Sequence, residues 1–226
     1  MPEISVVVPA YNEEASIERV AQDAVDALEH ASLVSYEIVL VDDGSTDQTR
    51  ARMEQARQRL TCVRVVYHVR NRGLGAALRT GYAAATGRIV TCIPGDGQVD
   101  LGETLKGLRL LGECDIVFVL RRGRRGASRS FISFCFHALI RLLFRFDATD
   151  ICGIYFLRRE LLMTLDPKSN NVFYSLELPL LCVKHKKRIQ RITVETLPRR
   201  AGVSKMANLR TLAVNLWEML KYRIRG

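Results

Sequence analysis

The sequence predicts a single α/β domain in which helices flank a mostly parallel central sheet. Short apolar runs rich in β-branched residues recur along the first half of the chain, as the buried strands of a parallel sheet require. Stretches with helical periodicity separate these runs, which indicates repeated β–α units. The expected strands are residues 4–8, 37–41, 63–67, 88–93 and 115–119. The expected helices are residues 15–30, a charged stretch that ends at residue 60, 71–85 and 101–111.

The second half is less regular. It is expected to form a helix at residues 174–184, a strand at 189–194 and a basic amphipathic helix at 209–222. Residues 131–146 are strongly apolar but contain Arg141 and Arg145, one helical turn apart. This segment is too short and too charged to span a bilayer, and it fits either a membrane interface or the protein core.

Charge is distributed unevenly along the 226 residues. Residues 1–116 contain 12 Lys and Arg against 17 Asp and Glu, a formal charge of −5. Residues 117–226 contain 22 against 7, a formal charge of +15. The second half is therefore expected to contact nucleic acid, an acidic membrane surface or a phosphorylated substrate. The sequence offers no nucleic-acid recognition motif, so we expect no nucleic-acid partner.

Cysteine usage and the absence of targeting signals bear on location. The six cysteines show no CxxC spacing and lie mostly in apolar segments, which is typical of a reduced compartment. No signal peptide precedes the first strand, and no apolar run reaches the roughly 18 to 20 residues of a transmembrane helix. We therefore expect a cytoplasmic protein.

The strand at residues 37–41 ends at two adjacent acids, Asp42 and Asp43, followed by Gly44 and Ser45. Adjacent carboxylates repel each other and resist desolvation, so neutral residues suit a plain loop better. The two acids fit hydrogen-bond acceptors for a polar ligand at the carboxyl edge of the sheet, where open α/β sheets bind ligands. The alternative is a turn that leads into and caps the next helix.

Two glycine-containing segments are further candidates. Residues 95–98 place Asp96 and Gln98 at a strand end, where they form either a divalent-cation site completed by substrate phosphates or a plain turn. Residues 71–77 open a helix but lack the third glycine of a dinucleotide-binding loop. Their small side chains allow the helix N-terminus to approach a ligand or the sheet closely.

Taken together, these blocks resemble the family 2 inverting glycosyltransferases of GT-A fold, and within them the polyprenyl-phosphate (dolichol-phosphate) mannose or glucose synthases. The blocks occur in the family's order at residues 8–13 (VPAYNE), 41–47 (VDDGSTD), 71–77 (NRGLGAA) and 95–98 (GDGQ). Three later blocks are similar to those of the synthase subgroup, at residues 129–133, 150–153 and 199–205.

The resemblance implies a role for each block. Residues 1–120 would form the nucleotide-sugar-binding part, and residues 121–226 the acceptor-binding, membrane-facing part of the same domain. The nucleotide sugar would be held by Pro9, Tyr11, Glu13, Asp42, Asp43, Arg199 and Lys205. Mg²⁺ or Mn²⁺ would bind Asp96 and Gln98, and the acceptor phosphate would bind Arg121, Arg129 and Ser133. Catalysis would depend on Asp96, Arg121 and Arg129.

The chain departs from the family pattern at two positions. Pro94 replaces the first acid of the family's Asp-x-Asp-x-Gln block, which removes one possible carboxylate ligand of the metal, and Arg88 stands where an acid is common. We expect no membrane-spanning C-terminal extension of the kind that some relatives have. We therefore expect a peripheral protein on the inner face of the membrane, bound to the membrane surface or to a membrane partner protein.

The resemblance implies metal-dependent, inverting transfer of a hexose from a GDP-mannose or UDP-glucose type of donor to a polyprenyl phosphate. A phosphate acceptor, with a second pKa of about 6, is already ionised near neutral pH and needs no general base. One alternative is a soluble hydroxyl acceptor, for which Glu177 or Asp150 would serve as base. Another is a non-catalytic nucleotide-sugar-binding or membrane scaffold protein, suggested by Pro94.

Overall fold

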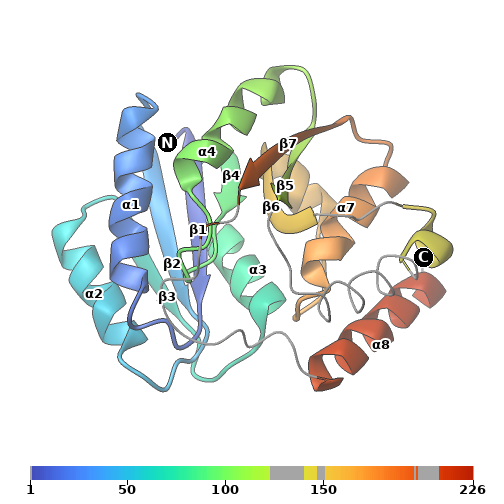
Figure 1. Cartoon of the computed structure of the whole chain (residues 1–226), viewed down its shortest axis with the longest axis horizontal. Helices are drawn as coiled ribbons and strands as arrows, with labels where there is room; N and C mark the ends of the chain where they lie inside the picture. Colours follow the sequence, from blue (N-terminus) through green and yellow to red (C-terminus); the bar gives the residue numbers. More distant parts are fainter. Residues whose placement is uncertain (1, 123–139, 147–150, 196, 198–208, 226) are drawn as a thin grey trace.

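A seven-stranded sheet forms the centre of the molecule, in the strand order β3-β2-β1-β4-β6-β5-β7 (Figure 1). The structure is a computed structural model that describes residues 2–122, 140–146, 151–195, 197 and 209–225. The strands are β1 (Ile4–Ala10), β2 (Tyr36–Asp42), β3 (Val63–Tyr67), β4 (Ile89–Cys92), β5 (Ile116–Arg122), β6 (Ile151–Arg158) and β7 (Ile189–Glu195).

The sheet is mostly parallel, which confirms the expected fold class. Strands β1 to β4 run parallel to one another, and β5 pairs in parallel with β7. Strand β6 is antiparallel to both of its neighbours, β4 and β5. Strand β5 therefore runs in the same direction as β4, and the carboxyl ends of β1, β2, β4 and β5 lie at one edge of the sheet.

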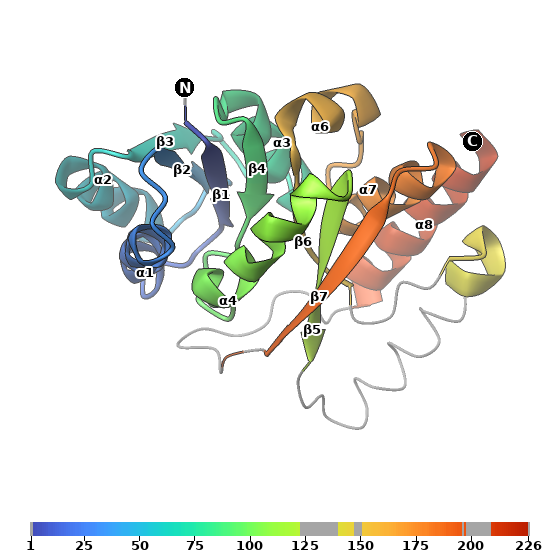
Figure 2. The same ribbon diagram turned by 90° about the horizontal axis from the view of Figure 1, so that it is seen from above.

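Helices cover both faces of the sheet, as the view from above shows (Figure 2). One face is covered by α1 (Ile17–His30), α2 (Thr49–Arg59) and α4 (Leu101–Leu105). The other is covered by α3 (Leu74–Ala84), α6 (Arg159–Leu165) and α7 (Tyr174–Lys184), with α8 (Leu209–Arg225) beside α7. On α1 the side chains of Ile17, Val20, Ala24 and Leu28 share one apolar face, and all four are buried.

Several boundaries differ from the sequence-based expectation. Strand β1 continues through Pro9, because its pairing with β4 ends at Val7 and no Pro9 amide hydrogen is needed there. The helix predicted at residues 101–111 divides into α4 and a 3₁₀ helix, η1 (Lys106–Gly112). Gly107 lies so close to the sheet that a Cβ atom there would be 3.2 Å from Val117 Cγ1. Residues 151–158, to which no strand was assigned, form β6.

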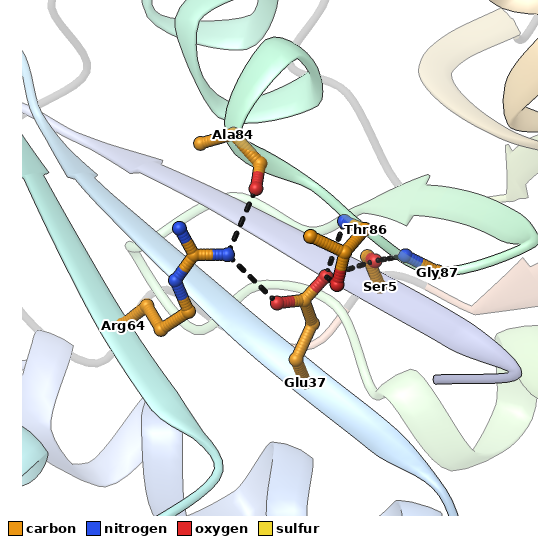
Figure 3. A network of polar contacts seen from close by, with 6 residues as sticks. All are labelled: Ser5, Glu37, Arg64, Ala84, Thr86 and Gly87. Carbon is orange, nitrogen blue, oxygen red and sulfur yellow. Dashed lines mark hydrogen bonds and ion pairs between the residues drawn. The ribbon is translucent and has the colours of Figure 1, made fainter. Parts of the chain in front are cut away.

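The buried carboxylate of Glu37 connects β2 to β1, to β3 and to the loop after α3 (Figure 3). Glu37 on β2 accepts hydrogen bonds from Ser5 Oγ (2.6 Å), Thr86 N (2.5 Å), Thr86 Oγ1 (2.8 Å) and Arg64 Nη1 (3.2 Å). Ser5 Oγ in turn accepts from Gly87 N at 2.8 Å. Burial alone would raise the pKa of Glu37, but these donors outweigh it and hold the pKa below its ordinary value of 4.5.

Candidate functional site

The loops that follow β1, β2 and β4 meet at the carboxyl edge of the sheet. Asp43 N donates to Ala10 O at 2.9 Å, which joins the end of β1 to the loop after β2. Gly95 N donates to Pro9 O at 3.2 Å, which joins the end of β1 to the loop after β4. Ser16 Oγ strengthens the second connection by donating to Gly95 O at 2.8 Å. Residues far apart in sequence are thus held together where open α/β sheets bind ligands.

A network of hydrogen bonds connects the loop after β1 to the loop after β2. Asn12 N donates to Ser45 Oγ at 2.9 Å, and Thr46 N donates to Asn12 Oδ1 at 2.8 Å. Glu13 N donates to Thr49 Oγ1 at 2.7 Å. Asn12 adopts a φ of 53°, a left-handed conformation that asparagine tolerates better than most residues. The small polar residues after β2 therefore organise the loop after β1, which contains Tyr11 and Glu13.

Asp42 is 2% exposed and closes β2. Its Oδ1 accepts from Ser45 N at 2.9 Å, so the turn interpretation is correct for one carboxylate oxygen. Its parallel neighbour in register is Tyr67, over whose ring the Arg50 guanidinium lies at 4.0 Å. The Tyr67 hydroxyl oxygen is buried and has no hydrogen-bond partner among the described residues. The part that Asp42 plays in nucleotide binding stays a prediction.

Asp43 is 4% exposed and bonded to internal partners. It accepts from Arg72 N and Gly73 N, both at 2.9 Å, and its Oδ1 lies 2.7 Å from His68 Nδ1. The other imidazole nitrogen lies 2.9 Å from Thr80 Oγ1 on α3. Asp43 therefore orders the loop before α3. Sequence reasoning missed His68, although a polar residue directly after β3 was an available signal.

Asp96 and Gln98 form a turn after β4. Asp96 Oδ1 accepts from Gln98 N at 3.0 Å, and Gly97 has a φ of 70°, which favours glycine. The carboxylate and amide oxygens fit a hard divalent cation, and Pro94 adds no ligand. Within the described ranges, no cluster of three or more His, Cys, Asp or Glu side chains could hold a metal. A cation bound here would need oxygen ligands from elsewhere, for which a diphosphate is suited.

The predicted acceptor residues are only partly placed. Arg121 lies near the end of β5, at the same edge of the sheet as the three loops, and pairs in register with Val194. Arg129, Ser133, Asp150, Arg199 and Lys205 lie outside the described residues. The basic arm that contains Arg199 and Lys205 follows Leu197, whose N–H donates to Gln98 O at 3.0 Å. Leu197 therefore lies beside the predicted metal site.

Glu177, the alternative general base, is 6% exposed at the start of α7. Both of its carboxylate oxygens lie 3.0 Å from Lys168 N, and Oε2 also accepts from Ser169 N at 2.7 Å. The carboxylate is thus occupied by backbone donors of its own chain. These bonds do not favour the role of proton acceptor for a substrate hydroxyl.

Comparisons of the sequence give the following similarities. The family model described as "Glycosyl transferase family 2" matches residues 5–165. Dolichyl-phosphate beta-glucosyltransferase of Mus musculus is 32% identical over 179 residues, covering 70% of this chain and 55% of that protein. Dodecaprenyl-phosphate galacturonate synthase of Rhizobium johnstonii is 43% identical over 108 residues, covering 43% of this chain and 29% of that protein. The chain thus spans just over half the length of the mouse relative.

The fold is similar to that of glucosyl-3-phosphoglycerate synthase from Mycobacterium tuberculosis. Its complex with Mn²⁺, UDP and glucosyl-3-phosphoglycerate has a TM-score of 0.72 and 26% identity, covering 98% of this chain and 80% of that one. Its complex with Mg²⁺ and UDP has a TM-score of 0.69 and 27% identity, covering 98% and 79%. The similarity therefore extends over almost the whole of this chain.

Proposed function

The chain belongs to glycosyl transferase family 2, and on this basis we propose that it transfers a hexose from a nucleotide sugar to a polyprenyl phosphate. The observation that carries the proposal is the meeting of the loops after β1, β2 and β4 at one edge of the sheet. The names of the mouse and Rhizobium relatives, which both refer to polyprenyl-type phosphates, support the acceptor class.

The proposed donor site lies on these loops. Pro9, Tyr11, Glu13 and Asp42 hold the nucleotide, and the hydrogen bonds around Asn12 keep their loops in place before the donor arrives. Such preorganisation reduces the ordering cost of binding. A uridine donor of the UDP-glucose type is supported by the UDP complexes of the structurally similar synthase, and a GDP-mannose type of donor is the alternative.

Asp96 and Gln98 are proposed to hold Mg²⁺ or Mn²⁺, as the metal complexes of the similar synthase suggest. When bound, the cation would neutralise charge on the leaving nucleoside diphosphate. The chain's own contribution is to present the Asp96 carboxylate on a glycine-flanked turn. Arg199 and Lys205 are proposed to hold the same diphosphate from the arm that follows Leu197.

The acceptor phosphate is proposed to bind Arg121, Arg129 and Ser133. Arginine side chains orient a phosphate through directed hydrogen bonds, which raises the probability of attack on the anomeric carbon. No general base is needed for an ionised phosphate, and this agrees with the internal hydrogen bonds of Glu177. The formal charge of +15 on residues 117–226 would then attract the anionic acceptor phosphate.

Peripheral binding to the inner face of the membrane is proposed to occur through α8. Val214, Trp217 and Leu220 lie on one side of this helix and are 40%, 59% and 47% exposed. Lys221 Nζ lies 5.2 Å from the Trp217 ring, so a cation accompanies the apolar surface, as in helices that lie in a membrane interface. Leu142, 79% exposed, belongs to residues 140–146, and this segment packs on α8 through Phe144 and Tyr222.

Among the described residues, no helix is both long enough and apolar enough to cross a membrane. The exposed apolar side chains of α8 are suited to shallow insertion, with the charged residues at the level of the lipid headgroups.

Transfer of radiolabelled sugar tests the proposal. Purified protein, Mg²⁺ or Mn²⁺, a polyprenyl phosphate, and either UDP-glucose or GDP-mannose are incubated, and the organic phase is counted. We expect a lipid-phase product that EDTA abolishes. Product only with water-soluble acceptors would support the hydroxyl-acceptor alternative, and donor binding without turnover would support a non-catalytic protein.

A further inference from the structure

A short segment of the second half lies across the start of α3. We call residues 168–171, between α6 and α7, the strap. Asn170 O accepts from Ala76 N at 3.0 Å and so caps an amide in the first turn of α3. Arg79 Nη2, one turn further along α3, donates to Asn170 Oδ1 at 2.6 Å. The strap therefore bonds to both backbone and side chains of α3.

The contact between the strap and α3 requires glycine on the α3 side. A Cβ atom at Gly75 would lie 2.4 Å from Ser169 O, and one at Gly73 would lie 2.5 Å from Asn170 O. Gly73 also has a φ of 94°, which few other residues adopt. The small residues of the block at 71–77, expected to allow close approach to a ligand or the sheet, thus allow close approach of the strap.

The opposite side of the same loop borders the proposed donor site. Gly44, in the loop after β2, lies so close to residues 70–71 that a Cβ atom there would be 2.3 Å from Arg70 C. Asp43 accepts from Arg72 N and Gly73 N. Residues 70–73 are therefore held between the strap and the loop that follows Asp42. A shift of the strap would be transmitted to that loop through these direct contacts.

Glu177 on α7 holds the strap through two of the strap's backbone amides. Its carboxylate, 6% exposed, accepts from the backbone amides of Lys168 and Ser169. We propose that Glu177 is a positioning residue that acts through the strap on the nucleotide-binding loops. This inference rests on the proposed donor site. It assigns the buried carboxylate of α7 a part in donor binding rather than in proton transfer.

Glu177→Gln is the first test, because glutamine keeps the size of the side chain. Its NH₂ group cannot accept from an amide N–H, so at least one strap hydrogen bond is lost. We expect the dissociation constant for UDP with Mg²⁺, measured by calorimetry, and the donor KM to rise about 3- to 10-fold, as loss of one such bond predicts. We expect kcat to change by less than about twofold, since the hydrogen bond is made equally before and during reaction. The pH profile of kcat should stay unchanged.

Glu160→Gln is the matched control. This exposed glutamate lies in the first turn of α6, outside the strap, and its substitution should leave UDP affinity unaltered. Gly75→Ala is a second, independent disturbance, since its new methyl group must push Ser169 away. Alanine favours a helix over glycine, so weaker UDP binding in this variant would not result from a less stable α3.

The outcomes separate the possible roles. A kcat that falls steeply in Glu177→Gln and loses its acid limb, with unchanged UDP affinity, would identify a general base and overturn the inference. A lowered melting temperature with unchanged UDP affinity in both Glu177→Gln and Gly75→Ala would leave Glu177 a purely structural role and would also overturn it. Wild-type protein that binds neither UDP nor a nucleotide sugar would overturn the proposed function itself.

Discussion

The two ends of the parallel strands use buried carboxylates in different ways. At the amino-terminal end, Glu37 is surrounded by donors from β1, β3 and the loop after α3, and this cluster joins core elements (Figure 3). At the carboxyl end, Asp42 and Asp43 bond mainly to backbone amides of loops. The same chemistry therefore secures the framework at one end and shapes loops at the other. Substitutions at the amino-terminal end should lower the stability and leave donor binding unchanged. Substitutions at the carboxyl end should weaken donor binding and leave the stability nearly unchanged.

The largest effect on activity is expected for Asp96→Asn. Loss of the carboxylate charge should weaken cation and diphosphate binding and lower kcat/KM at least about 100-fold, as removal of a transition-state electrostatic contact does. The melting temperature should change little, because Asp96 is only partly buried and lies in a turn. Initial rates measured across a Mg²⁺ titration check the prediction. A kcat/KM equal to that of the wild type at every Mg²⁺ concentration would remove Asp96 from the site.

Glu37→Gln should show the reverse pattern. The variant loses the charge of the ion pair with Arg64, and its NH₂ group replaces an oxygen that accepts from either Arg64 or Thr86. The expected cost is about 1–3 kcal/mol in unfolding free energy. Urea unfolding at pH 7 measures this cost. Donor KM and kcat of the folded variant should match the wild type. An unaltered unfolding free energy would contradict the account of Figure 3.

The pH dependence of the stability of wild type and Glu37→Gln gives a sharper test. The pKa of Glu37 is lower in the folded protein than its ordinary value of 4.5, so its stabilisation is present above pH 4.5 and is lost as the pH falls through the folded pKa. The stability difference between wild type and Glu37→Gln should therefore be full at pH 7 and shrink below pH 4.5. A stability difference between wild type and Glu37→Gln that grows as the pH falls below 4.5 would contradict this prediction.

Trp217→Ala tests the proposed membrane-binding surface of α8. Trp217 is the single tryptophan of the chain, so its fluorescence reports directly on α8. Vesicles that contain an anionic lipid should shift the emission of wild-type protein to shorter wavelength. Trp217→Ala should lower the vesicle-bound fraction about threefold or more, whereas Trp217→Phe should keep most of it. Absence of a spectral shift with anionic vesicles would exclude insertion of this residue.

A similarly small effect is expected for His68→Gln. The imidazole connects Asp43 to Thr80, and its loss should loosen the loop before α3 without removing a ligand contact. We expect the donor KM to rise about 3- to 10-fold, the equivalent of roughly 1 kcal/mol. Steady-state kinetics with varied donor check this. A much larger fall in kcat would show that His68 acts on the reacting groups.

The sequence predicted most strands and helices of the first half because their periodicity is local. Runs such as residues 37–41 are buried on both sides, and their apolar composition is sufficient to identify them. Strand β6 was missed because Gly153, which has a φ of 80°, interrupts its apolar run, and the pairing with β4 and β5 determines the strand. No local pattern shows the break between α4 and η1, and Gly107, which packs closely on the sheet, lies just after it.

The sequence predicts the candidate site as a set of residues, whereas its geometry depends on the fold. The acids at positions 42 and 96 were identified from strand ends and from family blocks, and the loops that follow β2 and β4 both contact the end of β1. The internal role of Asp43 depends on His68 and Gly73, which are 25 and 30 residues away in sequence. The strap depends on contacts about 90 residues apart, so Glu177 could be considered only as a base until the fold was known.

Calorimetric titration of UDP into Asp42→Asn and Glu37→Gln, in the presence of Mg²⁺, tests the contrast between the two ends most directly. We predict that Asp42→Asn loses most of the UDP affinity and keeps the wild-type unfolding free energy to within about 1 kcal/mol, while Glu37→Gln binds UDP like the wild type and is less stable. Equal UDP affinity in Asp42→Asn and the wild type would contradict the proposed placement of the donor site at the carboxyl edge.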